Sequence, residues 1–334
     1  MNITDFFKST FSQKEKKPMP ILSFPSVSLI GSAVTEITKS AELQAAGMKA
    51  VADRTDALAA VSMMDLSVEA EAFGCEIRII DGEVPTVISG CVASEKEANE
   101  LSVPAVGAAR TGIYVDAIAK AKKLITDRPV FAGIIGPFSL AGRIIGVDNV
   151  MFDCFDEPKK VEVVLKKATE FLISYAKAFK AAGADGIVMA EPLTGILSPS
   201  LADEFSHPYV KEIIDAVRSD SFAVIYHNCG ASAQYMTESL SLLGATAYHF
   251  GDALDMEYMV KNMPADTVIM GNVSPAAQFA GGTPDSMAQA VTELLEKCSR
   301  YPNFLLSSGC DIPPSSPWEN IDAFFKASKD FYKR

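Results

Sequence analysis

The chain has 334 residues, of which 49% are hydrophobic and 22% are charged, and this balance is typical of a folded globular protein. Its formal net charge of −12 disfavours a nucleic-acid-binding protein, because an acidic surface repels polyanions. The only basic run, Lys14–Lys17, contains a glutamate and is interpreted as a solvated segment. We therefore expect no nucleic-acid partner.

The cysteines and the hydropathy of the chain indicate a compartment. Six cysteines are scattered without a disulfide framework, and the N-terminal segment lacks the apolar core of a signal peptide. We therefore expect a reduced, cytoplasmic protein. The best candidate for a membrane span, residues 130–147, contains Pro137, Arg143 and four glycines. It is interpreted as a buried strand, a loop and the start of a helix, so no membrane insertion is expected.

In the first half of the chain, apolar runs predict short strands. The first strand is expected at residues 20–24 (PILSF), and a second apolar run, residues 57–65, ends at Asp65. Residues 75–80 and 86–92 flank the turn sequence DGEVP, which is typical of a hairpin. Residues 129–135 (PVFAGII) predict a buried strand.

From about residue 160 onward, helices and strands alternate regularly. A long amphipathic run from Val161 ends at a glycine, the usual end of a helix, and the strand sequence DGIVMAEP follows. Four further helix–strand pairs lead to the strands FAVIYHNCG, ATAYHFGD, TVIMGNVSP and NFLLSSGCD, and a last amphipathic helix ends the chain. This alternation predicts a parallel sheet of about eight strands, hence a (β/α)8 barrel, with an open doubly wound sheet as the alternative.

Nucleotide-binding motifs give no support for a cofactor of that kind. No GxGxxG opens a helix, and no GxxxxGK[ST] is present. In a (β/α)8 barrel, chemistry lies at the carboxyl ends of the strands. Polar and sulfur-containing residues repeatedly occupy those positions here: Asp65, Glu191, His227, Cys229, Asp252, Asn272 and Cys310.

Three of these residues form a candidate metal site. His227 and Cys229 lie at one strand end, and Cys310 follows the last strand, so all three side chains can converge at one mouth of a closed barrel. One imidazole and two thiolates suit Zn²⁺, and three protein ligands leave the fourth position open, as in catalytic zinc sites. Asp252 could occupy that position in the resting state, with Glu191 and His249 as competitors.

Other interpretations of these residues stay open. An isolated His-x-Cys pair occurs by chance, and free cysteines are mostly small buried hydrophobic residues. His249 falls inside a predicted strand and is interpreted as a buried, hydrogen-bonded histidine. The remaining cysteines are assigned to the apolar interior: Cys75, Cys91, Cys154 and Cys298.

Motifs in a fixed order along the chain carry a resemblance to a known family. They include MMDLSVEAEAFGCEI, GPFSLAGRIIG, AAGADGIVMAEP, HNCG, GNVSP and SSGCDIPPSSPWENIDAF. The sequence resembles the uroporphyrinogen decarboxylase superfamily, and within it the methylcobamide:coenzyme M methyltransferases. This resemblance implies one barrel domain over residues 1–334, with an N-terminal helical extension over about residues 1–18.

Within the superfamily, the site residues favour the methyltransferases. The decarboxylases carry arginines after the first strand, where this chain has none, and a histidine where it has Cys310. Asp65 does match the decarboxylase aspartate. His227, Cys229 and Cys310 match the zinc ligands of the methyltransferases one by one. Asp252 falls near the place of a carboxylate ligand that is usually a glutamate.

The resemblance implies a zinc-dependent enzyme that transfers a methyl group from a methylated corrinoid to a thiol. No DxHxxG cobalamin motif is present, so a separate corrinoid protein is expected to dock over the barrel mouth. The acceptor stays open among coenzyme M, homocysteine, another thiol and tetrahydrofolate. Side chains expected to bind substrate are Ser139, Arg143, Asn272, Ser274, Asp65 and Glu191. The alternatives are a metal-independent lyase that uses Asp65 and a non-catalytic module that binds the corrinoid protein.

Overall fold

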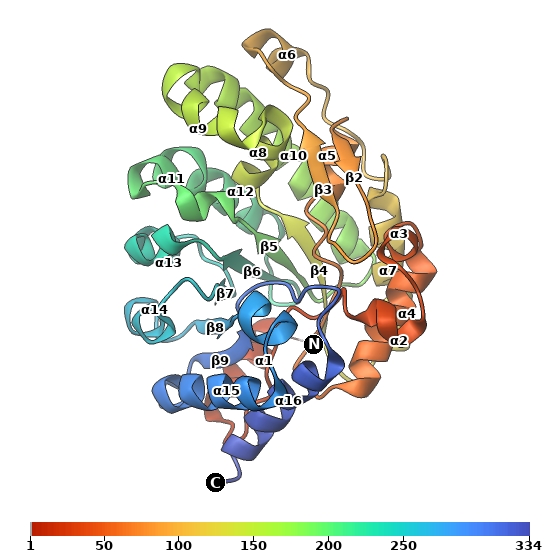
Figure 1. Ribbon diagram of the computed structural model, residues 1–334. Coiled ribbons are helices and arrows are strands. Elements are labelled where there is room, and N and C mark those ends of the chain that lie inside the picture. Colours follow the sequence, from red (N-terminus) through yellow and green to blue (C-terminus); the bar gives the residue numbers. More distant parts are fainter. Residues whose placement is uncertain (1) are drawn as a thin grey trace.

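The computed structural model describes residues 2–334 and has a curled parallel sheet surrounded by helices (Figure 1). The seven strands of this sheet are hydrogen-bonded in the order β1-β4-β5-β6-β7-β8-β9, and each pairing is parallel. A separate antiparallel hairpin joins β2 and β3, as the sequence predicts. The strands are β1 (Ala60–Val61), β2 (Glu76–Arg78), β3 (Thr86–Ser89), β4 (Val130–Ile135), β5 (Gly186–Ala190), β6 (Ala223–Asn228), β7 (Ala247–Phe250), β8 (Val268–Val273) and β9 (Phe304–Ser308).

The helices form the outer layer, with α4 and α7 beside the first strands and α15 and α16 beside the last (Figure 1). The α-helices are α1 (Ile3–Ser9), α2 (Ser26–Ile30), α3 (Val34–Ile37), α4 (Ala41–Arg54), α5 (Val68–Ala72), α6 (Glu95–Glu100), α7 (Thr111–Leu124), α8 (Pro137–Ile145), α9 (Val147–Asp156), α10 (Pro158–Ala181), α11 (Pro199–Phe205), α12 (His207–Val217), α13 (Thr237–Ser241), α14 (Met256–Asn262), α15 (Pro284–Cys298) and α16 (Trp318–Phe331). Short helical turns are η1 (Thr10–Ser12), η2 (Leu193–Ile196), η3 (Ala231–Tyr235) and η4 (Pro275–Ala280).

The segment around the predicted first strand connects the two edges of the sheet. The amide of Met19 donates to the carbonyl of Leu306 in β9 at 2.9 Å, and the amide of Leu58, just before β1, donates to the carbonyl of Pro18 at 2.8 Å. The segment does not form a regular ladder, because the amide of Ile21 donates instead to the hydroxyl of Ser308. Residues 20–24 therefore form no strand, and the sheet has seven strands where about eight were expected.

Side-chain alternation along the strands produces two apolar layers. One layer packs between the sheet and the helices, and the other fills the inside of the sheet. In β6, Ala223 and Ile225 belong to the inner layer, while Val224 and Tyr226 face the helices. His227 follows with the same alternation, so the strand directs its imidazole inward.

The N-terminal helix α1 belongs to this inner layer. Ile3 and Phe7 are buried with the inward side chains of the strands, and the ring of Phe7 lies 5.9 Å from the ring of Phe131. A short helix therefore packs against the interior of the sheet at the place of the expected N-terminal extension. The limits of the predicted single domain, residues 1–334, stay a prediction.

The apolar stretch from Val130 forms strand β4 and helix α8, as interpreted from the sequence. Within residues 2–334, no helix combines the length and the apolar character that a membrane span requires.

Candidate metal centre

The three predicted metal ligands lie together at the carboxyl end of the sheet. His227 is the second-last residue of β6, Cys229 is the first residue after that strand, and Cys310 lies two residues after the end of β9. Their ligand atoms all lie within 4.8 Å of one another, and the Nε2 atom of His227 is 3.4 Å from the sulfur of Cys310. An imidazole nitrogen and two sulfurs at this spacing are a suitable donor set for zinc.

A glycine in the neighbouring strand end makes room for this cluster. A Cβ atom added at Gly251, just after β7, would lie 2.5 Å from the Cα atom of Cys229. No side chain is tolerated at that distance, so the close approach of the two strand ends depends on a glycine. The arrangement of the chain around Cys229 is thus built into two adjacent strands.

The two thiols influence each other's ionisation. A hydrogen bond from Cys310, with a smaller contribution from His227, lowers the pKa of Cys229 to about 4. The same contact and burial hold the pKa of Cys310 well above its usual value, because a second negative charge beside the first is unfavourable. A bound divalent cation would neutralise this repulsion and allow both sulfurs to be thiolates.

His249 does not compete for the metal. Both of its ring nitrogens have partners: Nδ1 lies 2.7 Å from Nδ1 of His227, and Nε2 lies 2.7 Å from the hydroxyl of Ser307. The side chain is buried and belongs to the inner layer of β7. It is the buried, hydrogen-bonded histidine that the sequence indicated, and it contacts the metal ligand directly.

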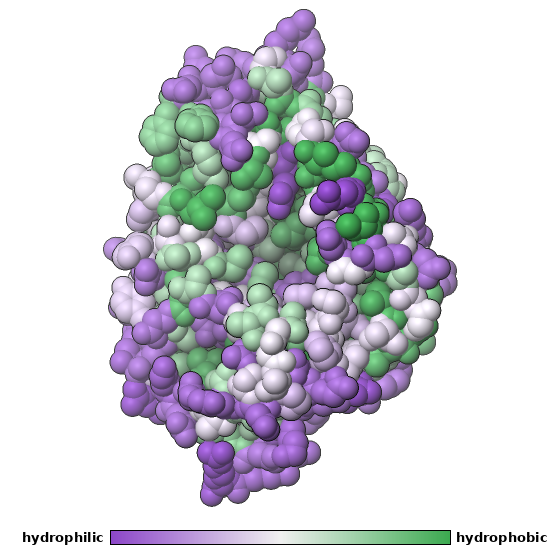
Figure 2. Space-filling view, viewed as in Figure 1, coloured by the Kyte–Doolittle hydropathy of each residue, from purple (hydrophilic) through white to green (hydrophobic). Residues whose placement is uncertain are grey.

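The cluster lines one wall of a cavity of about 480 Å³. The hairpin β2–β3 supplies another wall, and the hollow is visible at the centre of Figure 2, with apolar side chains over the hairpin beside it. Arg143 is the only lysine or arginine among the described residues that line this cavity. Among residues 2–334, its guanidinium forms no ion pair within 4.0 Å; burial lowers its pKa, but an arginine stays charged. The cavity therefore offers metal-binding sulfur on one side and an unpaired cation on another.

Asp252, Asn272 and Ser274 lie apart from this cavity. All three line a second cavity of about 610 Å³, next to α14 and α15. The side-chain amide of Asn272 donates to the carbonyls of Gly251 and Leu254, and the hydroxyl of Ser274 caps η4. Asp252 is exposed and is not part of the His–Cys–Cys group. Asp252 follows β7, as predicted, but its side chain lies against Gly309 and lines the second cavity instead of the first.

Ser139 and Glu191 are joined to each other inside the protein. Glu191 accepts hydrogen bonds from the amides of Phe138 and Ser139, from the hydroxyl of Ser139 at 2.7 Å and from the hydroxyl of Thr194. Burial raises the pKa of Glu191 to about 7. Neither residue lines the cavity, so of the six expected substrate-binding side chains only Arg143 does.

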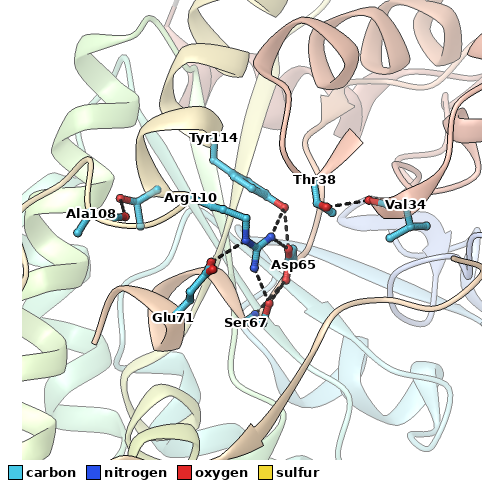
Figure 3. Close-up of polar contacts among 9 residues, drawn as sticks. Val34, Thr38, Asp65, Ser67, Glu71, Ala108, Arg110 and Tyr114 are labelled. Atoms are coloured by element: carbon cyan, nitrogen blue, oxygen red, sulfur yellow. Dashed lines mark hydrogen bonds and ion pairs between the residues drawn. The ribbon is translucent and has the colours of Figure 1, made fainter. Parts of the chain in front are cut away.

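Asp65 lies in a closed polar network with Arg110, Tyr114 and Ser67 (Figure 3). One carboxylate oxygen accepts from Arg110 at 2.5 Å and from the hydroxyl of Tyr114 at 2.7 Å. The other accepts from the amide and the hydroxyl of Ser67, and Arg110 also pairs with Glu71. Asp65 does not line the cavity. Arg110 could not be identified from the sequence, because it lies at the start of helix α7 and not at a strand end.

A residue that the sequence analysis overlooked lies next to the cluster. Asp311 follows Cys310 and lines the cavity; one of its oxygens lies 3.4 Å from the hydroxyl of Ser23, and the other has no hydrogen-bond partner among residues 2–334. Burial raises the pKa of Asp311 well above its usual value. Its position directly after a candidate ligand was the signal that could have identified it.

Comparison with known families supports the resemblance. A family model described as Uroporphyrinogen decarboxylase (URO-D) matches residues 25–331. The chain belongs to the uroporphyrinogen decarboxylase family.

Members of this family with curated names include both methyltransferases and decarboxylases. The "Methylcobamide:CoM methyltransferase MtbA" of Methanosarcina acetivorans is 29% identical over 274 residues, which cover 80% of this chain and 78% of the relative. A "Uroporphyrinogen decarboxylase" of Hydrogenovibrio crunogenus is 26% identical over 280 residues, covering 80% and 77%. The prediction of an enzyme related to methyltransferases is therefore confirmed.

Solved structures show the same fold for this member of the uroporphyrinogen decarboxylase family. A "methyltransferase from Methanosarcina mazei" superposes with a TM-score of 0.87 at 24% identity, covering 99% of this chain and 98% of that one. A B12-independent methionine synthase from Shewanella sp. W3-18-1 gives a TM-score of 0.51 at 13% identity, covering 80% and 78%. At these identities the likeness concerns the fold alone.

Proposed function

We propose that the chain is a zinc-dependent methyltransferase that moves a methyl group from a protein-bound methylated corrinoid to a thiol such as coenzyme M. The observation that carries this proposal is the convergence of His227, Cys229 and Cys310 within 4.8 Å on the wall of a cavity. The relatives named methylcobamide:CoM methyltransferases support both the donor and the acceptor.

The donor set fits zinc with one position left for substrate. His227, Cys229 and Cys310 would hold the metal, and Asp252 is not part of this group of three. A zinc ion held there would lower the pKa of an acceptor thiol and keep its sulfur nucleophilic.

The protein's own residues orient the acceptor. Arg143 can bind an anionic tail, since its charge is unpaired and it lines the same cavity as the cluster. The apolar walls, which include Met64, Leu66 and Val84, exclude water from the sulfur. A small thiol with a sulfonate or carboxylate at its other end therefore suits the cavity.

The transfer needs no reactant other than the acceptor thiol and the methylated corrinoid. The acceptor sulfur, having lost its proton, forms a bond to the methyl carbon of the methyl–Co(III) corrinoid. The Co–C bond breaks with its electron pair on cobalt, which gives a methyl thioether and Co(I). The chain supplies the nucleophile's position, and a partner protein supplies the corrinoid at the cavity mouth.

The proposal includes a finer description of the fold and its setting. We interpret the curled sheet and the bridging segment around Met19 as one (β/α)8 barrel domain. We also propose a reducing, cytoplasmic setting, in keeping with the free thiols of all six cysteines in the described part of the chain.

Metal analysis of matched cysteine variants tests the proposal. We expect about one zinc per chain in the wild-type protein, strong loss in Cys310→Ser, and no loss in Cys298→Ser, whose thiol is buried in α15. The same preparations are then assayed with free methylcobalamin and coenzyme M. A wild-type protein without zinc, or a Cys310→Ser variant that keeps its zinc and its activity, would refute the mechanism. Activity that depends on Asp65 and not on zinc would instead favour the lyase.

A further inference from the structure

We infer that His249 and Ser307 are positioning residues that fix the protonation of the metal ligand His227. A histidine binds a metal only through an unprotonated ring nitrogen, and the hydrogen bond made by its other nitrogen decides which one that is. The inference rests on the proposed function in so far as zinc is the metal that His227 holds. It goes further because it assigns a role to two residues outside the ligand set.

The hydrogen bonds of Ser307 determine which ring nitrogen of His249 carries the proton. The hydroxyl of Ser307 lies 2.7 Å from the carbonyl oxygen of Met19, and a carbonyl can only accept, so the hydroxyl donates there. The lone pairs of that hydroxyl oxygen are left to accept from Nε2 of His249, 2.7 Å away. His249 therefore carries its proton on Nε2, and its Nδ1 is an acceptor.

The partners of Nδ1 of His227 determine which of its own ring nitrogens carries the proton. Its Nδ1 lies 2.7 Å from the Nδ1 of His249 and 3.3 Å from the carbonyl oxygen of His249. Both of these atoms are acceptors, so Nδ1 of His227 must be the donor. The proton of a neutral His227 is thus on Nδ1, and the lone pair of Nε2 is free.

The free nitrogen is the one that faces the sulfurs. Nε2 of His227 lies 3.4 Å from the sulfur of Cys310, while Nδ1 points to His249. Strand alternation places His227, His249 and Ser307 on the inner face of β6, β7 and β9, and all three are buried. The row of hydrogen bonds that runs from Met19 through Ser307 and His249 to His227 is shielded from water, which would otherwise offer alternative hydrogen-bond partners.

The arrangement leaves no place for a second proton on His249, because its Nδ1 faces the donating Nδ1 of His227. No carboxylate lies within hydrogen-bond distance of either imidazole among residues 2–334. One proton therefore lies between the two Nδ1 atoms, with His227 as its donor and His249 as its acceptor.

The unaltered, metal-free protein provides the first test. The chain has only three histidines, so the ring nitrogens of each can be resolved by ¹H–¹⁵N correlation of the side chains. We expect a protonated Nδ1 for His227 and a protonated Nε2 for His249. The Nε2-protonated form of His227 overturns the inference, whatever the activity of the enzyme.

Zinc affinity, measured by chelator competition, provides the second test. Ser307→Ala and His249→Leu are expected to weaken zinc binding about 10- to 100-fold, the usual effect of losing such a supporting contact. His249→Asn should recover most of this, because its amide oxygen can accept from His227. The matched control is Ser308→Ala, an equally buried serine of the same strand that bonds to the amide of Ile21.

Equal zinc affinities for Ser307→Ala and Ser308→Ala overturn the inference. A protein with the expected protonation and zinc affinities but no methyl transfer refutes the proposed function and leaves the roles of His249 and Ser307 intact. Methyl transfer by a protein whose His227 is protonated on Nε2 would support the proposed function and refute the roles of His249 and Ser307.

Discussion

Two polar clusters lie inside this protein, and they differ in what their atoms are left to do. In the cluster of Asp65, Arg110, Tyr114 and Ser67, both carboxylate oxygens accept two hydrogen bonds, and Asp65 does not line the cavity. In the cluster around His227, one imidazole nitrogen and two sulfurs converge on the cavity wall.

The difference separates structural from chemical roles. A buried polar group whose partners are all within the protein stabilises one conformation, and it is costly to disturb. A group with uncommitted ligand atoms beside a cavity is available to bind. Asp65 is held in an ion pair with Arg110, whereas the two cysteines remain open to a metal.

The largest effect that tests the difference between the two clusters is the loss of zinc affinity expected on substitution of Cys229. Cys229→Ser removes one of three metal-binding atoms, so zinc affinity should fall by more than the roughly 100-fold that supporting residues reach. Methyl transfer should fall with it, while the free energy of unfolding of the metal-free protein changes little. Zinc titration and denaturant unfolding of the metal-free forms measure the two quantities. A large loss of stability without loss of zinc would place Cys229 with the structural cluster.

The opposite pattern is expected at Arg110. Arg110→Met leaves the buried Asp65 without its partner and should lower the free energy of unfolding by about 3–5 kcal/mol. Zinc per folded chain should not change. Lys211→Met, which breaks an exposed pair with Asp215, is the matched control and should cost about 0.5 kcal/mol or less. Urea unfolding of the three proteins measures these differences, and equal costs at the two sites would contradict the assignment.

A smaller effect, limited to substrate, is expected at Arg143. A charged hydrogen bond contributes about 1.5–3 kcal/mol, so Arg143→Met should raise the KM for coenzyme M at least about 10-fold with little change in kcat. The neutral thiol 2-mercaptoethanol, which has no anionic tail, should be used equally well by both proteins. Steady-state kinetics with free methylcobalamin compares the two acceptors. Similar losses for both thiols would show that Arg143 does not recognise charge.

The last effect, on the pH dependence of stability alone, concerns Glu69, next to the structural cluster. It accepts from the amide of Ile135 at 3.0 Å, its other oxygen has no partner among residues 2–334, and burial raises its pKa from 4.5 to about 8. Between pH 4.5 and 8 the folded state keeps a proton that the unfolded state has lost, so this contribution to stability falls as pH rises.

Glu69→Gln should remove that dependence. Below pH 4.5 the wild-type carboxyl is protonated in both states, and above pH 8 its contribution is lost. The variant should therefore gain on the wild type across this window, by at most about 1.4 kcal/mol per pH unit. Unfolding free energies measured at several pH values provide the comparison, and parallel curves for the two proteins would disprove the assignment.

The sequence predicted the part of the fold in which regular patterns govern structure. From β4 onward every predicted strand and helix is present, because apolar runs and amphipathic helices alternate there without interruption. The strand expected at residues 20–24 is absent, since its hydrogen bonds go partly to a side chain, and periodicity does not report such contacts. In the run at residues 57–65, only Ala60–Val61 forms a strand.

For the site, the sequence predicted which residues lie at the strand ends, but not which cavity their side chains line. The strand-end rule placed His227, Cys229 and Cys310 together, and these three do converge. It placed Asp252, Asn272 and Ser274 on the same edge, where the loops direct them toward another cavity. The pairing of His249 with His227 depends on hydrogen bonds that end at Ser307 and Met19, and no local pattern encodes them.

The bond between Ser307 and Met19 also has a consequence for the order in which the chain acquires its native contacts. It joins residues 288 positions apart, so it closes almost the whole chain and is formed against a large loop entropy. In the order of synthesis, Ser307 and Cys310 follow His227, Cys229 and His249. A nascent chain can fold its early helices, but it cannot complete a three-ligand site until its C-terminal strand has met its N-terminal segment.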